Sequence, residues 1–211
     1  MSAAAWSAAP AALWLAGAYI AGSIPTSFWV ARVFGGVDLR GFGSGNLGAT
    51  NLYRAMGWKA AIPVGVFDVL KGTAPVLLFE RYAGASAGWP LAVGVAAVLG
   101  HVFSPFVRFR GGKGVATAAG VFLALAPLSL LVALVTWALV LWLSGYVSLG
   151  SMVAAAAFLA SVPILYAGSR ERLWAALATF VFIVFTHRSN IRRLLAGTES
   201  RFGRRGAAGK A

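Results

Sequence analysis

Glycine and small polar residues fill one short segment of an otherwise apolar chain, GFGSGNLGATN at positions 41–51. Gly43, Gly45 and Gly48 have the spacing of a dinucleotide-binding turn, but that turn follows a β-strand, whereas a membrane helix is predicted before this segment. Small residues let the backbone approach an anion closely, and successive N–H groups can bind it. The segment therefore predicts a phosphate-binding loop. Its candidate ligand residues are Arg40, Ser44, Asn46, Thr50, Asn51 and Arg54.

A second candidate phosphate site is the run RGGKG at positions 110–114. A Walker A loop requires Gly-x-x-x-x-Gly-Lys-Ser/Thr, and Val107 and Gly114 stand where that pattern needs a glycine and a hydroxyl residue. Lys113 instead precedes a predicted helix, whose free N–H groups and macrodipole favour an anion. We expect Gly112, Lys113 and Gly114 to contribute to phosphate binding. The alternative is a lysine that anchors the chain at the membrane surface.

Residues suited to handling a hydroxyl group lie in other segments. In HRSNIRR, His187 and Asn190 are one helical turn apart, so both could face a hydroxyl group that is to be oriented or deprotonated. Ser148 and Ser151, three positions apart at the start of a span, can cap that helix or bind a ligand. His101 stands near the end of another predicted span, as either a ligand or a structural residue.

Charged residues are rare within the predicted spans. Asp68 and Lys71 are three positions apart and share a helix face, so we expect an ion pair, with a structural and a functional role equally open. Glu199 follows the last predicted helix and is expected to bind a nearby arginine rather than to act as a base.

The composition places this chemistry in a membrane. Of the 211 residues, 60% are hydrophobic and 11% are charged, and the mean hydropathy is +0.81. A soluble domain of this length could not bury so much apolar surface, which excludes a soluble nucleic-acid-binding protein despite the net charge of +13. The lack of cysteine excludes disulfides and thiolate chemistry. We expect no cofactor and, because the two histidines are far apart in sequence, no metal site.

The apolar runs predict an all-α, polytopic integral membrane protein with about seven transmembrane helices, some of them short. Residues 115–143 are either one long helix kinked at Pro127 or two short spans. An N-terminus outside and a cytoplasmic C-terminus put the lysines and arginines on the cytoplasmic side, apart from Lys71 in a span and three outer arginines. We expect a single membrane-embedded domain over residues 1–211, with a basic and flexible tail at 197–211. The predicted helices are 11–34, 59–80, 89–106, 113–126, 127–144, 148–166 and 173–187.

In this orientation the segments richest in glycine, polar residues and cations all face the cytoplasm. A shared side for separate segments of this kind favours one binding site over several unrelated turns. The segments are 38–54, 108–120, 145–151 and 187–199.

Taken in order, these segments resemble the bacterial acyl-phosphate:glycerol-3-phosphate acyltransferase family over about residues 11–202. The resemblance implies an enzyme of phospholipid synthesis in the bacterial inner membrane, with its active site at the cytoplasmic face. Such an enzyme moves a fatty acyl group from acyl phosphate to the 1-hydroxyl of sn-glycerol 3-phosphate, giving lysophosphatidic acid and phosphate. The matching pieces are GSIPTSFWVAR (22–32), DLRGFGSGNLGATNLYR (38–54), FDVLKGTAPV (67–76), GHVFSPFVRFRGGKGVAT (100–117), YVSLGS (146–151) and HRSNIRRLLAGTE (187–199).

On this resemblance, the loop at 38–54 is expected to hold the head group of acyl phosphate with its amides as donors, and a groove between helices holds the acyl chain. Ser44 and Arg40 are expected to take part in catalysis. The head-group residues are expected to be Arg40, Ser44, Gly45 and Asn46. Further substrate-binding residues of this loop are expected to be Gly43, Thr50, Asn51 and Arg54.

The acceptor is expected to bind elsewhere. His187 and Asn190 complete the expected catalytic residues, with His187 positioning the attacking hydroxyl. The division between donor and acceptor residues stays open, as does the proton acceptor, which is either His187 or the donor phosphate. The residues expected to hold glycerol 3-phosphate are Lys113, Ser148, Ser151 and Asn190. Gly112, Gly114 and His101 are expected to bind substrate as well.

Two other classes of protein are alternatives. A transporter for an organic phosphate would need polar residues through both leaflets, whereas here they crowd one face. A lipid-binding scaffold would explain the basic tail RFGRRGAAGK but not Ser44, Asn46, Lys113 and Asn190 on one side. The expected partners are glycerol 3-phosphate, acyl phosphate and the lipid bilayer, with the enzyme that produces acyl phosphate as a further candidate and no nucleic acid.

Overall fold

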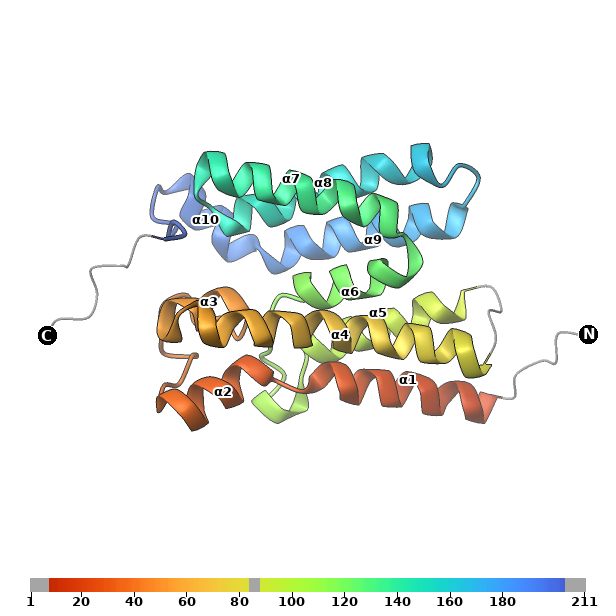
Figure 1. The fold of residues 1–211 in the computed structure, drawn as a ribbon, viewed down its shortest axis with the longest axis horizontal. Helices are drawn as coiled ribbons and strands as arrows, with labels where there is room; N and C mark the ends of the chain where they lie inside the picture. The colour runs from red at the N-terminus through yellow and green to blue at the C-terminus, as the bar shows by residue number, and fades with distance from the viewer. Residues whose placement is uncertain (1–7, 84–87, 204–211) are drawn as a thin grey trace, which may run out of the picture. The chain divides into compact units, whose positions relative to one another are not determined.

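The chain folds into helices. The computed structural model describes residues 8–83 and 88–203, and every regular element within them is helical, as predicted (Figure 1). The chain divides into two compact units, Met1–Leu125 and Ala126–Ala211. The first unit contains α1 (Ala8–Ser23), α2 (Thr26–Gly35), α3 (Ala49–Met56), α4 (Trp58–Ala83), α5 (Trp89–Val102), a 3₁₀ turn η1 (Pro105–Val107) and α6 (Val115–Leu125). The second contains α7 (Pro127–Ser144), α8 (Val147–Leu165), α9 (Arg170–Thr186) and α10 (Arg188–Leu195).

The first predicted helix, 11–34, is wrong as a single element. It consists of α1 and α2, which are separated at Ile24 and Pro25. Proline lacks an N–H group and disfavours a helical conformation in the residue before it, so the ladder of α1 stops there. The break leaves carbonyl groups of α1 in need of donors from outside the helix.

The glycine-rich loop ends in a helix that the sequence analysis missed. Residues 49–56 form α3, which packs on α2 and α4. Ala49 lies against Gly65 of α4, where an added Cβ would make an ordinary contact of 3.8 Å with the alanine. The first residue of α3 is therefore held beside the first half of α4.

The segment after α5 turns back over the end of that helix. Phe109 N–H donates to the Ser104 carbonyl at 2.8 Å, and Gly111 N–H donates to the Val102 carbonyl at 2.9 Å. Arg108 and Phe109 both have positive φ, at 55° and 58°, a conformation that costs about 1–3 kcal/mol for such residues. This return lets α6 begin beside the middle of α4 rather than at its end (Figure 1).

Helices α4 and α6 cross at glycines. A side chain at Gly72 would collide with the Thr117 carbonyl, and one at Gly120 would collide with the Val69 carbonyl. The Thr73 hydroxyl donates to the Gly120 carbonyl at 2.8 Å. Small residues and a hydroxyl hydrogen bond are the usual means by which helices approach closely in membranes.

In the second unit, α7 packs on α8 and α8 packs on α9. The choice left open for 115–143 is decided in favour of two helices, because the chain leaves the helical conformation at Ala126 (φ −151°, ψ 61°) just before Pro127. Helix α7 covers the predicted range 127–144, and α8 differs from its predicted range by one residue at each end.

Four helical segments in the described ranges are long and apolar enough to cross a bilayer. Helices α1, α6 and α9 have 16, 11 and 17 residues, fewer than the roughly 20 that a perpendicular span requires. Large exposed apolar side chains such as Trp142, 80% exposed, and Leu131, 59% exposed, suit α7 to contact with lipid. The four segments are Trp58–Ala83, Trp89–Val107, Pro127–Ser144 and Val147–Leu165.

Candidate active site

The glycine-rich loop is organised around the side chain of Asn51, which is 1% exposed. Its amide nitrogen donates to the carbonyls of Leu39 at 3.2 Å and Phe42 at 2.9 Å, and its oxygen accepts from Ser44 N–H at 3.1 Å. Gly43, with φ 56°, lies directly over this amide, and a Cβ there would sit 2.5 Å from the Asn51 oxygen. Asn51, which was expected to bind substrate, therefore holds the loop together with both ends of its side chain.

Some loop amides expected to bind phosphate are used within the loop. Ser44 N–H donates to Asn51, and Gly45 N–H donates to the Phe42 carbonyl at 2.9 Å. The amides of Ala49 and Thr50, the first two of α3, have no acceptor among the described residues, and no side chain caps this helix. The α3 N-terminus, at the end of the loop, is thus the stronger place for an anion.

Arg40 is held at the entrance to this loop by Asp38. Its Nε lies 3.0 Å and its Nη2 2.6 Å from the two carboxylate oxygens, and its guanidinium stacks 4.9 Å over the ring of Phe28. These side-chain bonds, with a further bond from Arg40 N–H, lower the pKa of Asp38 to about 2. The pair fixes the orientation of Arg40 and engages part of its hydrogen-bonding edge.

The RGGKG segment leads into a second helix start, as predicted. Gly114, with φ 80°, precedes α6, and its carbonyl accepts the first bond of that helix from Ala118 N–H at 2.8 Å. The amides of Val115 and Ala116 have no acceptor in the described part of the chain. Lys113, two residues before Val115, is partly exposed. His101 lies behind this segment, 8% exposed, with its ring against Gly112.

In the second unit, Glu199 binds three residues from two helices, α8 and α10. Its Oε1 accepts from the Ser148 hydroxyl at 2.7 Å and from Asn190 Nδ2 at 2.6 Å, and its Oε2 accepts from Arg193 Nε at 2.7 Å. The predicted bond to an arginine is confirmed. The contacts to Ser148 and Asn190 were missed. The chain has only five acidic residues, so the position of one of them directly after a basic segment was a usable signal.

Glu199 is ionised despite its burial. Burial alone would raise the pKa of this carboxyl, but hydrogen bonds from Ser148, Asn190 and Arg193, with the charge of Arg193, outweigh it and lower the pKa. Because the hydrogen of Ser148 is committed to the carboxylate, that hydroxyl can only accept from a ligand. Ser151 is committed in the same way, since its hydroxyl donates to the Val147 carbonyl at 2.9 Å.

His187 stands at the joint between α9 and α10 and is 2% exposed. Its Nδ1 is 2.8 Å from the Ile183 carbonyl oxygen, which can only accept a hydrogen bond. Nδ1 therefore donates a hydrogen to this carbonyl, which fixes the orientation of the imidazole ring.

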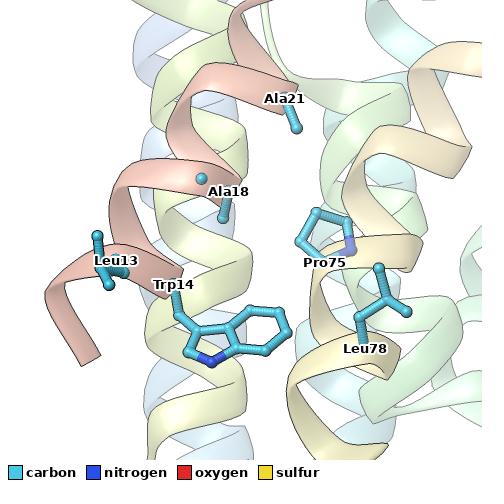
Figure 2. Close-up of a pocket in the computed structure, with 7 residues that line it drawn as sticks. Leu13, Trp14, Ala18, Ala21, Pro75 and Leu78 are labelled. Atoms are coloured by element: carbon cyan, nitrogen blue, oxygen red, sulfur yellow. The ribbon is translucent and has the colours of Figure 1, made fainter. Parts of the chain in front are cut away.

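An apolar groove of about 380 Å³ lies between α1 and α4 in the first unit (Figure 2). Trp14, Ala18 and Ala21 of α1 face Pro75 and Leu78 of α4 across it (Figure 2). The wall from Leu13 to Ala21 is about 12 Å long at 1.5 Å per residue. Its lining by small and aliphatic side chains, with the ring of Trp14, suits an alkyl chain.

Comparison with known proteins gives one consistent family. The profile described as glycerol-3-phosphate acyltransferase matches residues 12–197. Proteins of that name from Trichlorobacter lovleyi and Geobacter sulfurreducens are each 48% identical to this chain, covering 90% and 88% of it and 96% and 94% of their own lengths.

Solved structures agree with the sequence relatives. The chain is similar to a crystal structure of PlsY (YgiH), an integral membrane glycerol 3-phosphate acyltransferase, in its glycerol 3-phosphate form. The TM-score is 0.85 at 39% identity, over 92% of this chain and 96% of that one. The lysophosphatidic acid form gives a TM-score of 0.82 at 36% identity, with the same coverage.

The Glu199 contacts predict a pH-dependent stability. Replacement by glutamine, Glu199→Gln, should lower the thermal unfolding midpoint in detergent at neutral pH, because three donors lose a charged acceptor. A lowered pKa in the folded state stabilises it above the usual value of 4.5 and ceases to do so as the pH falls through the folded value. The gap between wild type and variant should therefore narrow on acidification below 4.5. Glu171→Gln, an exposed carboxylate in the first turn of α9, is the control and should change little. A gap that stays constant with pH would contradict the assignment.

Proposed function

Because the chain belongs to the glycerol-3-phosphate acyltransferase family, we propose that it transfers a fatty acyl group from acyl phosphate to the 1-hydroxyl of sn-glycerol 3-phosphate. The products are lysophosphatidic acid and phosphate. The observation that carries this proposal is the pair of uncapped helix starts, α3 and α6, each preceded by a glycine-rich segment in a chain otherwise built for lipid. Both substrates of this reaction carry a phosphate group, so two anion sites are needed.

The proposed donor site is the loop that leads into α3. Arg40, Ser44, Gly45 and Asn46 bind the phosphate of acyl phosphate, joined by the amides of Ala49 and Thr50. The hydroxyls of Ser44 and Thr50 make no hydrogen bond to other described residues, which leaves both as donors for phosphate oxygens. Gly43, Asn51 and Arg54 support this loop.

The proposed acceptor residues bind glycerol 3-phosphate through both of its ends. Lys113, with Gly112, Gly114 and the start of α6, binds the phosphate. Ser148 and Ser151 accept hydrogen bonds from the glycerol hydroxyls, because their own hydrogens are committed. Asn190 assists them, and the carboxylate of Glu199 holds Ser148 and Asn190 in place.

Transfer is proposed to be direct. The acceptor hydroxyl oxygen attacks the carbonyl carbon of the mixed anhydride, the bond from that carbon to the phosphate oxygen breaks, and phosphate leaves. The hydroxyl proton passes to His187 Nε2 or to the departing phosphate. No covalent enzyme intermediate is needed, because acyl phosphate is already activated and positioning with oxyanion stabilisation can supply the catalysis.

The membrane arrangement is also proposed. Seven spans in the bacterial inner membrane, with the N-terminus outside and the C-terminus cytoplasmic, agree with the distribution of cations. The active site then faces the cytoplasm, where glycerol 3-phosphate is found. The family match over residues 12–197 spans both compact units, which supports a single membrane-embedded domain. The enzyme that produces acyl phosphate is proposed as a partner, since a reactive anhydride is best passed on directly.

The reaction is tested with the purified chain, glycerol 3-phosphate and either acyl phosphate or acyl-CoA. Lysophosphatidic acid should form from acyl phosphate only. Product from neither donor would contradict the proposed reaction, and product from acyl-CoA alone would contradict the assignment of acyl phosphate as the donor. In the same assay, a His187→Ala variant that keeps wild-type turnover would leave the donor phosphate as the proton acceptor.

Gly36 and Gly43 both have positive φ, so alanine substitutions at the two positions distinguish a change in loop geometry from backbone strain alone. Gly36→Ala and Gly43→Ala each force an alanine into a conformation that costs about 1–2 kcal/mol, but only at Gly43 does the new Cβ meet Asn51. Gly43→Ala should raise the KM for acyl phosphate by about tenfold or more, whereas Gly36→Ala should leave it within about twofold. Equal KM values in the two variants would show that Asn51 does not shape the donor site.

The groove of Figure 2 is proposed to hold the acyl chain. Gly17 lines it and has no neighbour within 4 Å of an added Cβ, so the Cβ of a Gly17→Leu substitution meets no collision and the larger side chain can occupy the groove. Turnover of long-chain acyl phosphates should fall by about tenfold, with short chains spared. Ala16→Leu, on the exposed part of the same helix, is the matched control. An equal loss for long and short chains would place the acyl group elsewhere.

A further inference from the structure

An ion pair is buried in the middle of α4. Asp68 is 2% and Lys71 5% exposed, and Lys71 Nζ lies 2.7 Å from Asp68 Oδ1. A buried pair of this kind is weak support for stability, because its desolvation offsets much of the attraction and apolar residues often serve as well. The contacts that surround this ion pair indicate a more specific role for it.

Lys71 has a second partner at the break between α1 and α2. Its Nζ donates to the Ile24 carbonyl at 2.9 Å. This carbonyl follows the last residue of α1, where Pro25 ends the helical ladder, and a buried carbonyl without a donor is costly at membrane depth. Lys71 thus ties the broken helix to α4.

Asp68 has a second neighbour from α5. His101 Nδ1 lies 3.8 Å from Asp68 Oδ1, and the opposite side of the ring, at Nε2, abuts Gly112 so closely that any side chain there would collide with it. The His101 carbonyl also accepts from Gly112 N–H at 3.2 Å. The imidazole is therefore enclosed between the carboxylate and the residue next to Lys113.

The pair also lies between the two helix starts. On α4, Gly65 contacts Ala49 at the start of α3, and Gly72 contacts Thr117 in the first turn of α6. Asp68 and Lys71 stand between these glycines. A shift of this stretch of α4 would move both helix starts, whereas a shift of the His101 ring alone would move the RGGKG segment.

We propose that Asp68, Lys71 and His101 are positioning residues for the reaction, a buried cluster that fixes the place of Gly112 and Lys113 through the His101 ring. This inference rests on the proposed function for its effect on catalysis. None of the three is assigned contact with substrate: Lys71 is engaged by Asp68 and the Ile24 carbonyl, Asp68 lies between Lys71 and His101, and a carboxylate would repel a phosphate.

The first test removes the charge of Lys71 alone and then the charges of Asp68 and Lys71 together. Lys71→Met leaves a buried carboxylate without its cation and should lower the unfolding midpoint and raise the KM for glycerol 3-phosphate by about tenfold. In Asp68→Asn/Lys71→Met the midpoint should recover in part, because the Ile24 carbonyl still lacks its donor. The KM for glycerol 3-phosphate should stay high, and that for acyl phosphate should change by less than about twofold. Recovery of both quantities would reduce the pair to a structural role and overturn the inference. Ser129→Ala, which removes a buried hydroxyl with no hydrogen-bond partner among described residues, is the control.

The second test uses the contact between His101 and Gly112. Gly112→Ala places a Cβ in the ring, so its KM for glycerol 3-phosphate should rise. In His101→Ala/Gly112→Ala the collision is gone, and the KM should equal that of His101→Ala alone. Additive losses in the double variant would mean that the ring does not position this residue.

A third measurement needs no substrate. Amide hydrogen exchange of residues 108–117 should speed up in Lys71→Met and His101→Ala and stay unchanged in Ser129→Ala. If the wild-type chain made no lysophosphatidic acid, the proposed function would fail. The exchange rates would still show whether Lys71 and His101 hold residues 108–117 in place. Unchanged exchange in both variants would overturn the inference by itself.

Discussion

Within a bilayer, each backbone N–H and C=O group must find its partner inside the protein, and the first unit is arranged around this constraint. Two of its helices end at irregular backbone inside this unit, at Ile24 and after Val102. Lys71 donates to the Ile24 carbonyl, and Ser104 donates to the Ser23 carbonyl at 2.5 Å. The Tyr19 hydroxyl donates to the Phe103 carbonyl at 2.6 Å. Irregular backbone, which a substrate site requires, is thus kept beside lipid-facing helices.

Helix α4 is the element on which these breaks converge. It accepts α3 at Gly65 and α6 at Gly72, the second so closely that a side chain there would be excluded. The two short helices present uncapped N-termini to their glycine-rich segments, and the positive ends of their dipoles are worth most where water is scarce. An anion site in this fold therefore depends as much on glycines within α4 as on the loop residues themselves.

The sequence predicted helix bounds best where the length of an apolar run sets them, as in α7 and α8. It also located the polar segments that form the candidate site. It failed at Pro25, because the apolar residues on both sides concealed a break that the tertiary donors Lys71 and Ser104 make tolerable. Helix α3 was missed because the loop ahead of it gives a strong turn signal. At the candidate site, the residue types were predictable, but their hydrogen-bond partners were not. The bonds of Asn51, Ser148 and Ser151 depend on the folded positions of their partners.

Among the few carboxylates of this basic chain, Asp38, Asp68 and Glu199 each lie at ion-pair distance from a cation. In a protein whose substrates are anions, such groups would compete with the ligand if they stood free. Because each is paired with a cation, these carboxylates instead orient groups that can bind the substrate. Asp38 holds Arg40 at the loop, and Glu199 turns the hydrogen of Ser148 inward, so that the serine oxygen is left to accept from a hydroxyl. A phosphate needs donors, whereas an attacking hydroxyl needs acceptors, and carboxylates paired in this way allow one basic chain to offer both.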